Sequence, residues 1–279
     1  MKLPEYFTFT QSNLQDYVDC PYRFYLRCIL KMKWPALVVD DALAFERRGQ
    51  IGARFHQLIQ QYLSGIPEAR ITGLAEADPA PEQYRWWEDF LKFASPRLEG
   101  EKFVEMTLST CLEGQFLLAK FDLILLKNDG DLAIFDWKTS RRTPRKDWLL
   151  QRIQTRLYRY VLAEAGAEVT GGQTISPDRI SMNYWFATQP QAPVMLPYSQ
   201  DAFRSDEAGL RRLIHEITER DTAEFLRTED FDKCRYCVYR SHCDRGGQAG
   251  NLESFEDFET GPEDFDLDIE FDQIAEIAF

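Results

Sequence analysis

The sequence GQFLLAKFDLILLKNDGDLAIFDWKTS, residues 114–140, decides the fold that we expect for this chain. Its two mostly apolar runs flank an Asn-Asp-Gly triplet at 128–130, a composition typical of a tight turn between antiparallel strands. Side chains two residues apart in a strand point to the same face. Asp136 and Lys138 should therefore lie side by side near the end of the second strand, while Trp137 faces away.

The charged residues of this hairpin are its most informative feature. Asp122 lies in the first strand, and Asp136 lies in the second, close to Lys138. Two carboxylates and an ammonium group are costly to remove from water in an otherwise apolar hairpin. A divalent cation is the usual reason for such a set, because hard cations prefer oxygen ligands. The hairpin therefore predicts a metal site.

The chain has 279 residues and a formal net charge of −13, which is unusual for a protein that binds nucleic acid. Much of this charge lies at the C-terminus, because residues 252–279 hold eleven acidic residues and no basic one. The rest of the chain is near neutral and can carry local basic patches. The sequence has no run of about 18 apolar residues, and its first residues do not resemble a signal peptide, so we expect a cytoplasmic protein.

Segment 47–63, RRGQIGARFHQLIQQYL, has apolar residues at the spacing of an amphipathic helix. His56 lies beside the apolar stripe, and Gly49 and Gly52 precede it on the same side by two turns and one turn. Glycine in a helix costs about 1 kcal/mol relative to alanine. Two glycines beside a histidine suggest that something approaches the backbone closely there. On this evidence His56 is either a ligand or an ordinary surface residue.

Segment 148–163 is expected to form a second amphipathic helix, with a buried stripe of leucine, isoleucine and valine. Gln154 and Tyr158 lie on another face at i,i+4 spacing, and a polar face of this kind is usually solvated. Elsewhere the sequence predicts four further elements. They are a helix with a capping box at Ser12 and Gln15, a strand at 103–112 in which Glu105 is an ordinary exposed carboxylate, a strand at 179–187, and a helix at 206–226.

Three cysteines, Cys234, Cys237 and Cys243, lie within ten residues near the C-terminus. In a reducing compartment, clustered cysteines bind metal more often than they form disulfides. A closed tetrahedral zinc site or an iron–sulfur cluster needs a fourth ligand. His242 is disfavoured because its neighbour Cys243 already serves, which leaves Cys20 as the better candidate, more than 200 residues away. The alternative for Cys20 is a buried thiol without a ligand.

Taken together and in this order, the motifs resemble those of the RecB-like branch of the PD-(D/E)XK nucleases. The chain is most similar to the iron–sulfur members of that branch, the AddB-type nuclease domains and the CRISPR-associated RecB-like exonucleases, over residues 10–245. The resemblance rests on Cys20-Pro21, Gly52-x-x-x-His56, Asp122 with Asp136-Trp137-Lys138-Thr139, Gln154-x-x-x-Tyr158, and the C-x₂-C-x₅-C pattern of Cys234, Cys237 and Cys243. Ala119 and Ser140 stand where the family usually has glycine.

The resemblance implies an α/β, restriction-endonuclease-like fold, in which helices flank a central mixed sheet. It also implies helical additions and a C-terminal lobe that contains the cysteine cluster. The nuclease domain would span residues 1–250, with an iron–sulfur lobe formed by residues near 20 and 234–243. Residues 251–279 would be an acidic tail, either disordered or able to dock on a basic DNA channel or a partner.

The resemblance also implies the roles of individual residues. A Mg²⁺ or Mn²⁺ ion would be held by His56, Asp122, Asp136 and the backbone carbonyl of Trp137, and Lys138 would orient or deprotonate the attacking water. Gln154 and Tyr158 would steady the site or contact DNA, and Glu105 could be an outer carboxylate of the site. Cys20, Cys234, Cys237 and Cys243 would hold a 4Fe-4S cluster, with zinc as the alternative.

The function implied is a metal-dependent DNA nuclease. It would act as an exonuclease on single-stranded or frayed ends in DNA repair, recombination or CRISPR adaptation. The alternative is a DNA-end-binding or assembly module of the same fold with little activity. The sequence has no P-loop motif, so any unwinding would come from a helicase partner.

Overall fold

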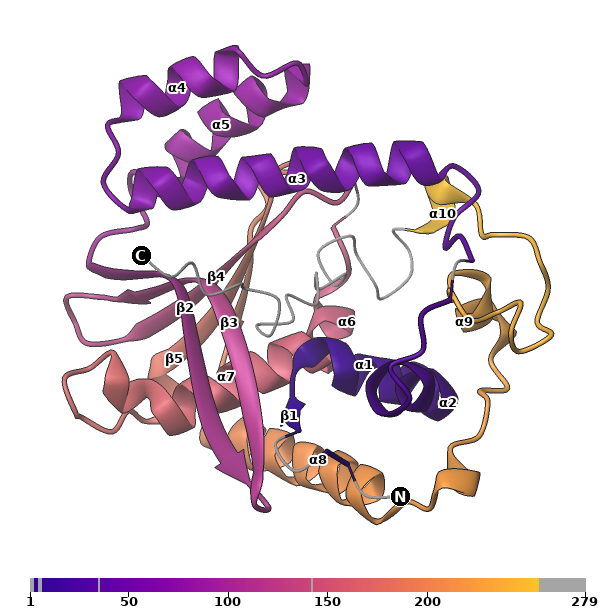
Figure 1. Cartoon of the computed structure of the whole chain (residues 1–279). Coiled ribbons are helices and arrows are strands. Elements are labelled where there is room, and N and C mark those ends of the chain that lie inside the picture. The colour runs from indigo at the N-terminus through magenta and orange to yellow at the C-terminus, as the bar shows by residue number, and fades with distance from the viewer. Residues whose placement is uncertain (1–2, 5–6, 35, 142, 256–279) are drawn as a thin grey trace, which may run out of the picture.

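The computed structural model describes residues 3–4, 7–34, 36–141 and 143–255, so the prediction for the acidic tail falls almost wholly outside the described residues. Within them the chain forms a six-stranded mixed sheet with the path β1-β3-β4-β5-β6, and β2 pairs with β3 (Figure 1). The sheet runs antiparallel from β2 to β4, parallel from β4 to β5, and antiparallel again to β6. The strands are β1 Thr8–Phe9, β2 Glu101–Leu112, β3 Gln115–Leu126, β4 Leu132–Lys138, β5 Ile180–Phe186 and β6 Val194–Pro197.

Helices cover both faces of this sheet, which confirms the predicted α/β class (Figure 1). One face packs against α3, α4 and α5, and the other packs against α7 and α8. In the described part of the chain no helix is long and apolar enough to cross a membrane. The helices are α1 Gln11–Asp19, α2 Pro21–Phe24, α3 Ala42–Leu63, α4 Glu68–Glu76, α5 Pro81–Ala94, α6 Lys146–Gln151, α7 Ile153–Ala165, α8 Gln200–Glu219, α9 Phe231–Arg235 and α10 Leu252–Phe255.

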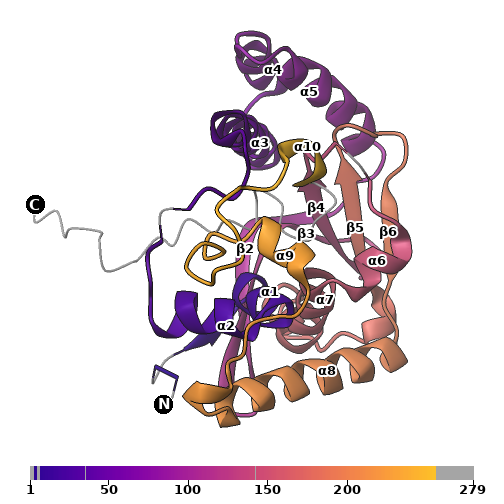
Figure 2. The same ribbon diagram turned by 90° about the vertical axis from the view of Figure 1, so that its right-hand side faces the viewer.

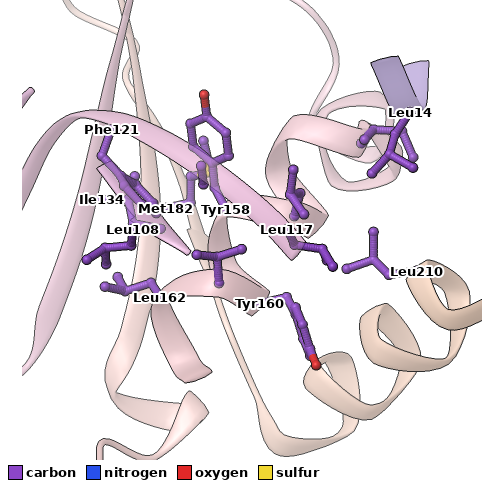
Figure 3. Close-up of a cluster of buried hydrophobic side chains, with 14 of the residues drawn as sticks. Leu14, Leu108, Leu117, Phe121, Ile134, Tyr158, Tyr160, Leu162, Met182 and Leu210 are labelled. Atoms are coloured by element: carbon purple, nitrogen blue, oxygen red, sulfur yellow. The ribbon is translucent and has the colours of Figure 1, made fainter. Parts of the chain in front are cut away.

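Each face of the sheet has its own apolar core. The larger core joins the sheet to α7 and α8 through residues such as Leu117, Tyr158 and Leu210 (Figure 3). The second core is rich in aromatic rings, and Trp137 and Trp185 pack there against α3 and α5. These two cores fix the ends of β3 and β4 relative to α3 and α7.

The predicted strands and the central hairpin agree with the structure, whereas the predicted helices differ in extent, and α3 begins at Ala42 rather than at residue 47. Helix α1 is capped by Thr10 rather than Ser12, because the Thr10 hydroxyl accepts the Asn13 N–H and the Asn13 side chain accepts the Thr10 N–H. The single helix expected at 148–163 is two helices, since Arg152 adopts an extended conformation between α6 and α7. Helix α8 begins at a Ser199 cap and ends well before residue 226.

Residues 226–255 form a small C-terminal lobe that bridges the start of α3 and the α1–α2 segment (Figure 2). Val39 and Gly250 pair as an isolated β-bridge, and the Leu252 N–H donates to Asp40 Oδ1 at 2.9 Å. Val39, Tyr236 and Leu252 form a third, minor apolar cluster at this junction. The lobe therefore holds the chain that leads into α3.

Candidate functional site

The candidate site lies where strands β3 and β4 separate. Their last ladder pair is Leu123 with Phe135, and the next residues are Asp122 and Asp136. Beyond this point Asp122 Oδ2 accepts the Trp137 N–H at 2.9 Å. The carboxylate thus takes the place of a ladder carbonyl, and it is held in the gap between the two strands.

Asp136 is the most enclosed acidic side chain of the site, with 4% of its surface exposed. Its Oδ1 atom accepts the Gln154 Nε2–H at 2.7 Å, and its Oδ2 atom lies 3.0 Å from Lys138 Nζ. Trp137, between them in sequence, is buried on the opposite face against α5. The predicted orientation of Asp136, Trp137 and Lys138 is therefore confirmed.

His56 reaches the site from α3. Its Nδ1 atom lies 3.7 Å from Asp122 Oδ2, and both side chains are 21% exposed. One turn earlier, a Cβ atom on Gly52 would lie 2.8 Å from Thr139 Oγ1, so α3 packs closely against the end of β4. The close approach expected from the glycines beside His56 is confirmed at Gly52.

Burial raises the pKa of Asp122, although His56, the Trp137 N–H and Lys138 act in the opposite direction. The Asp122 anion therefore lacks full compensation from the protein itself. A bound cation would supply that compensation.

Gln154 and Tyr158 are both buried, so the expectation that they form a solvated face is wrong. The break at Arg152 starts α7 as a separate helix, and this helix packs against β3 and β5. The Tyr158 ring packs 5.0 Å from the Phe121 ring. Burial and the nearby Asp136 and Asp122 raise the pKa of Tyr158 well above its usual value, which keeps its hydroxyl protonated.

A comparison with models of protein families matches residues 8–244 to one family. The chain belongs to the PD-(D/E)XK nuclease superfamily. No curated protein matches it. Among solved structures, the superfamily member described here is similar to SSO0001, with 15% sequence identity and a TM-score of 0.41 over 86% of both chains. It is also similar to a protein from Eubacterium rectale that is named a putative exonuclease, with 8% identity and a TM-score of 0.44 over 75% of this chain and 80% of that one.

PD-(D/E)XK nucleases usually use Mg²⁺ or Mn²⁺. Within the described residues, no group of three or more His, Cys, Asp or Glu side chains already has the arrangement of a metal site. The donor types at the separated strands nevertheless fit a hard divalent cation, since Asp122 and Asp136 offer carboxylate oxygens and His56 offers an imidazole nitrogen. The raised pKa of Asp122 is a second observation in favour of a cation there.

The four cysteines predicted to be ligands lie together, away from the separated ends of β3 and β4. Cys20, Cys234, Cys237 and Cys243 line one small cavity between α2 and the C-terminal lobe. No disulfide joins them, and burial raises the pKa of the Cys243 thiol to about 11. His242 is not among the lining residues and instead stacks on Tyr22, so the structure places Cys20 and not His242 beside the other three cysteines.

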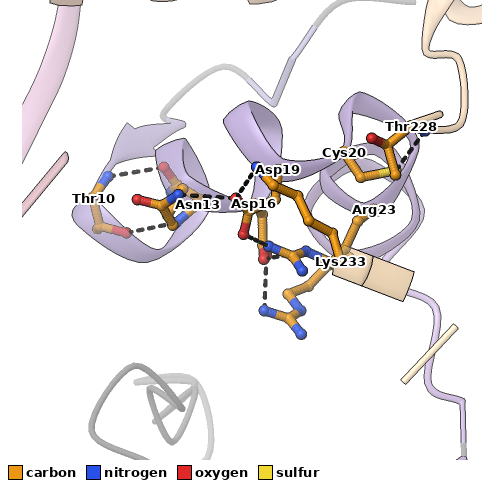
Figure 4. A network of polar contacts seen from close by, with 10 residues as sticks. Thr10, Asn13, Asp16, Asp19, Cys20, Arg23, Thr228 and Lys233 are labelled. Carbon is orange, nitrogen blue, oxygen red and sulfur yellow. Dashed lines mark hydrogen bonds and ion pairs between the residues drawn. The ribbon is translucent and has the colours of Figure 1, made fainter. Parts of the chain in front are cut away.

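A buried network of charges adjoins the cysteine cavity, and sequence reasoning missed it (Figure 4). Arg23 lies between Asp16, at 2.7 Å, and Asp19, and Lys233 reaches Asp19 at 2.9 Å from the C-terminal lobe. Arg27 adds a second ion pair to Asp16. The i,i+4 spacing of Asp19 and Arg23 was the signal available in the sequence.

Proposed function

We propose that this protein is a metal-dependent deoxyribonuclease that hydrolyses phosphodiester bonds at the separated ends of β3 and β4. The observation that supports the proposal most is the setting of Asp136, whose two oxygens are held by Gln154 and Lys138 beside Asp122 and His56. A buried carboxylate whose two oxygens both have partners has a fixed orientation, which is what a metal ligand needs. Hydrolysis of a phosphodiester needs negative groups that hold a cation and a positive group that faces the developing charge.

The residues that would hold the ion are His56, Asp122, Asp136 and the main-chain carbonyl of Trp137. A bound Mg²⁺ or Mn²⁺ ion supplies charge neutralisation at the scissile phosphate and makes bound water more acidic. The protein's own contribution is to fix the ligands. The Trp137 N–H anchors the Asp122 carboxylate, and Gln154 Nε2 anchors Asp136.

Lys138 supplies the positive charge of the proposed mechanism. Its Nζ atom lies 3.0 Å from Asp136 Oδ2, and its side chain is 19% exposed. An adjacent carboxylate favours the charged form of an ammonium group. We therefore assign Lys138 to orientation of the attacking water and stabilisation of charge, rather than to removal of a proton, which would need a neutral amine.

The substrate class that we propose is DNA with single-stranded or frayed ends, cleaved exonucleolytically. This choice, together with a setting in DNA repair, recombination or CRISPR adaptation, is supported by the motif resemblance to RecB-like exonucleases. A helicase or a CRISPR adaptation protein would be the partner that supplies such ends.

The cysteine cavity is proposed to hold a 4Fe-4S cluster, with zinc as the alternative ion. Among the described residues, four thiols and five basic side chains line the cavity and no acidic one does, which suits a group that has net negative charge with its thiolates. The basic residues are Arg23, Arg227, Lys233, Arg240 and Arg245.

The proposal is tested by incubating the purified protein and Mn²⁺ with three labelled DNAs: linear single strands, circular single strands and blunt duplexes. We expect degradation of the linear strands, slower attack on the duplex, and no attack on the circle. Cleavage of the circle would replace the exonuclease assignment with an endonuclease. Binding of DNA ends without cleavage under any metal would instead support the DNA-end-binding module.

A further inference from the structure

Glu105 has a backbone conformation that is unusual for its position in the sheet. Its φ angle is +52°, in the left-handed region, although it lies in the middle of strand β2 and not in a turn. Left-handed backbone is unfavourable for residues with a Cβ atom by about 1–2 kcal/mol. Such strain persists only where the surrounding structure enforces it, and it gathers at functional sites.

The β2–β3 ladder is interrupted at this residue. Val104 pairs with Leu123 and Met106 pairs with Phe121, so the register is the same on both sides. The pair between them, Glu105 opposite Asp122, is missing from the ladder. Glu105 is thus the direct cross-strand neighbour of a proposed metal ligand.

Both strands change face at this interrupted pair. In β3, Phe121 belongs to the core that contains α7, whereas Leu123, two residues later, belongs to the core that contains α3 and α5. In β2, Met106 packs against the first core and Val104 against the second. A regular strand keeps residues two apart on the same face. The switch therefore takes place at Glu105 and Asp122.

The switch explains how Asp122 reaches the site. In a regular strand Phe121 and Leu123 would share one face, and the Asp122 side chain would project from the opposite face into one of the two cores. Instead its carboxylate lies in the gap between β3 and β4, where it accepts the Trp137 N–H and approaches His56.

We propose that Glu105 is a positioning residue for Asp122, acting through its left-handed backbone, which interrupts the ladder and turns the Asp122 carboxylate into the gap between β3 and β4. The inference rests on the proposed function, because it takes Asp122 as a metal ligand. The Glu105 side chain forms an ion pair with Lys120, since its Oε2 atom lies 2.8 Å from Lys120 Nζ. The role is therefore assigned to the backbone and not to the carboxylate.

The experiment measures Mn²⁺ affinity of the full chain without DNA, by titration followed with electron paramagnetic resonance. E105V favours extended backbone and should restore a regular ladder, so we expect at least tenfold weaker Mn²⁺ binding. E105G accepts the left-handed conformation, and E105Q keeps the side-chain shape without its charge, so both should stay within about threefold of the wild type.

Glu113 provides the matched control, because it lies in the same hairpin with φ +54° but at the β2–β3 turn. E113V should lower the melting temperature and leave Mn²⁺ affinity unchanged. If E105V does not fold, E105A takes its place, with an expected loss of at least threefold relative to E105G.

Wild-type affinity in E105V, or a tenfold loss in E105G, would overturn the proposal. A tenfold loss in E105Q would move the role to the carboxylate and overturn it as well. D122N separates this inference from the proposed function. If D122N binds Mn²⁺ as well as the wild type, the metal site itself is refuted. If D122N loses Mn²⁺ affinity while E105V keeps it, only the role of Glu105 is refuted.

Discussion

At the scale of single residues, the two oxygens of the Asp136 carboxylate have different partners. Oδ1 accepts a hydrogen bond from Gln154, which is buried and fixes the orientation of the group. Oδ2 faces the ammonium group of Lys138. This division leaves Gln154 as an orienting residue and Lys138 as the group that can act on water or phosphate.

The first prediction concerns Gln154. Q154A leaves Asp136 Oδ1 without its 2.7 Å donor, so we expect metal affinity and cleavage rate to fall by about 10- to 100-fold. Q151A is the matched control, because Gln151 is exposed at the end of α6. Titration of Mn²⁺ and single-turnover cleavage check both variants. Equal effects of Q154A and Q151A would show that the Asp136 contact has no role.

At the scale of elements, the site depends on how closely α3 packs against the end of β4. Gly52 permits the approach of Thr139, and His56 follows one helical turn later. Helix α3 is tied on its other side to the segment between α4 and α5, where Arg54 forms two hydrogen bonds to Asp78. The glycine contact and this ion pair thus act together with the apolar core under α3 to position His56.

The second prediction concerns Gly52. In G52A the new methyl group would meet Thr139 Oγ1 at 2.8 Å, so either α3 or the Thr139 side chain must shift. We expect a loss of about 1–3 kcal/mol in stability and at least about a tenfold loss in cleavage rate. G73A in α4 is the control, since a Cβ there meets nothing within 4 Å. It should stabilise the protein by roughly 0.5–1 kcal/mol. Full activity in G52A would contradict the packing argument.

The third prediction concerns the pH dependence of stability. Hydrogen bonds from Arg54 lower the pKa of Asp78, outweighing its burial. A carboxyl group whose pKa is lowered on folding stabilises the protein above its unfolded pKa, and this stability is lost as pH falls through the folded pKa. D78N should cost about 1 kcal/mol at pH 7 and progressively less below about pH 4.

Chemical denaturation of D78N and the wild type at several pH values measures this difference. D89N, which removes a pair with an exposed Lys92, is the control and should show no such trend. A D78N effect that stays constant down to acidic pH would refute the linkage.

Several elements of the fold and site were predictable from the sequence for identifiable reasons. The hairpin followed from apolar runs around a turn, and the side-by-side placement of Asp136 and Lys138 followed from strand alternation. The burial of Gln154 was not predictable from the helical pattern, because the break at Arg152 has no glycine or proline to signal it, and only the family motif placed Gln154 at the site. The left-handed Glu105 was likewise hidden, since nothing local marks a non-glycine residue for that conformation.

At the scale of the whole molecule, the cysteines that line the cavity come from opposite ends of the described chain. Cys20 follows α1, and Cys234, Cys237 and Cys243 lie more than 200 residues later in the sequence. The C-terminal lobe also holds the segment that leads into α3, since Tyr239 Oη donates to the Met32 carbonyl at 2.8 Å. A group bound by the four thiols would therefore close a very long loop and stabilise the approach to α3.

The fourth prediction concerns this closure. If the cavity holds the proposed 4Fe-4S cluster, C20S should lose its absorbance near 400 nm (an approximate expectation for thiolate–iron charge transfer) and melt at least about 5 °C lower. C111S is the control, because Cys111 is exposed in β2 and does not line the cavity. Metal analysis with absorbance spectra and thermal melting checks both variants. A colourless wild-type protein with stoichiometric zinc would refute the iron assignment and retain the closure.

The most direct test of the nuclease centre is a paired measurement of Mn²⁺ affinity and cleavage of linear single-stranded DNA in the wild type, D136A and K138A. We predict that D136A loses both metal affinity and cleavage, because it removes a proposed metal ligand. We predict that K138A loses cleavage and keeps metal affinity near that of the wild type, because we assign its ammonium group to the attacking water and the developing charge and not to the metal. Equal cleavage by all three proteins would contradict the assignment of these strand ends as a nuclease centre.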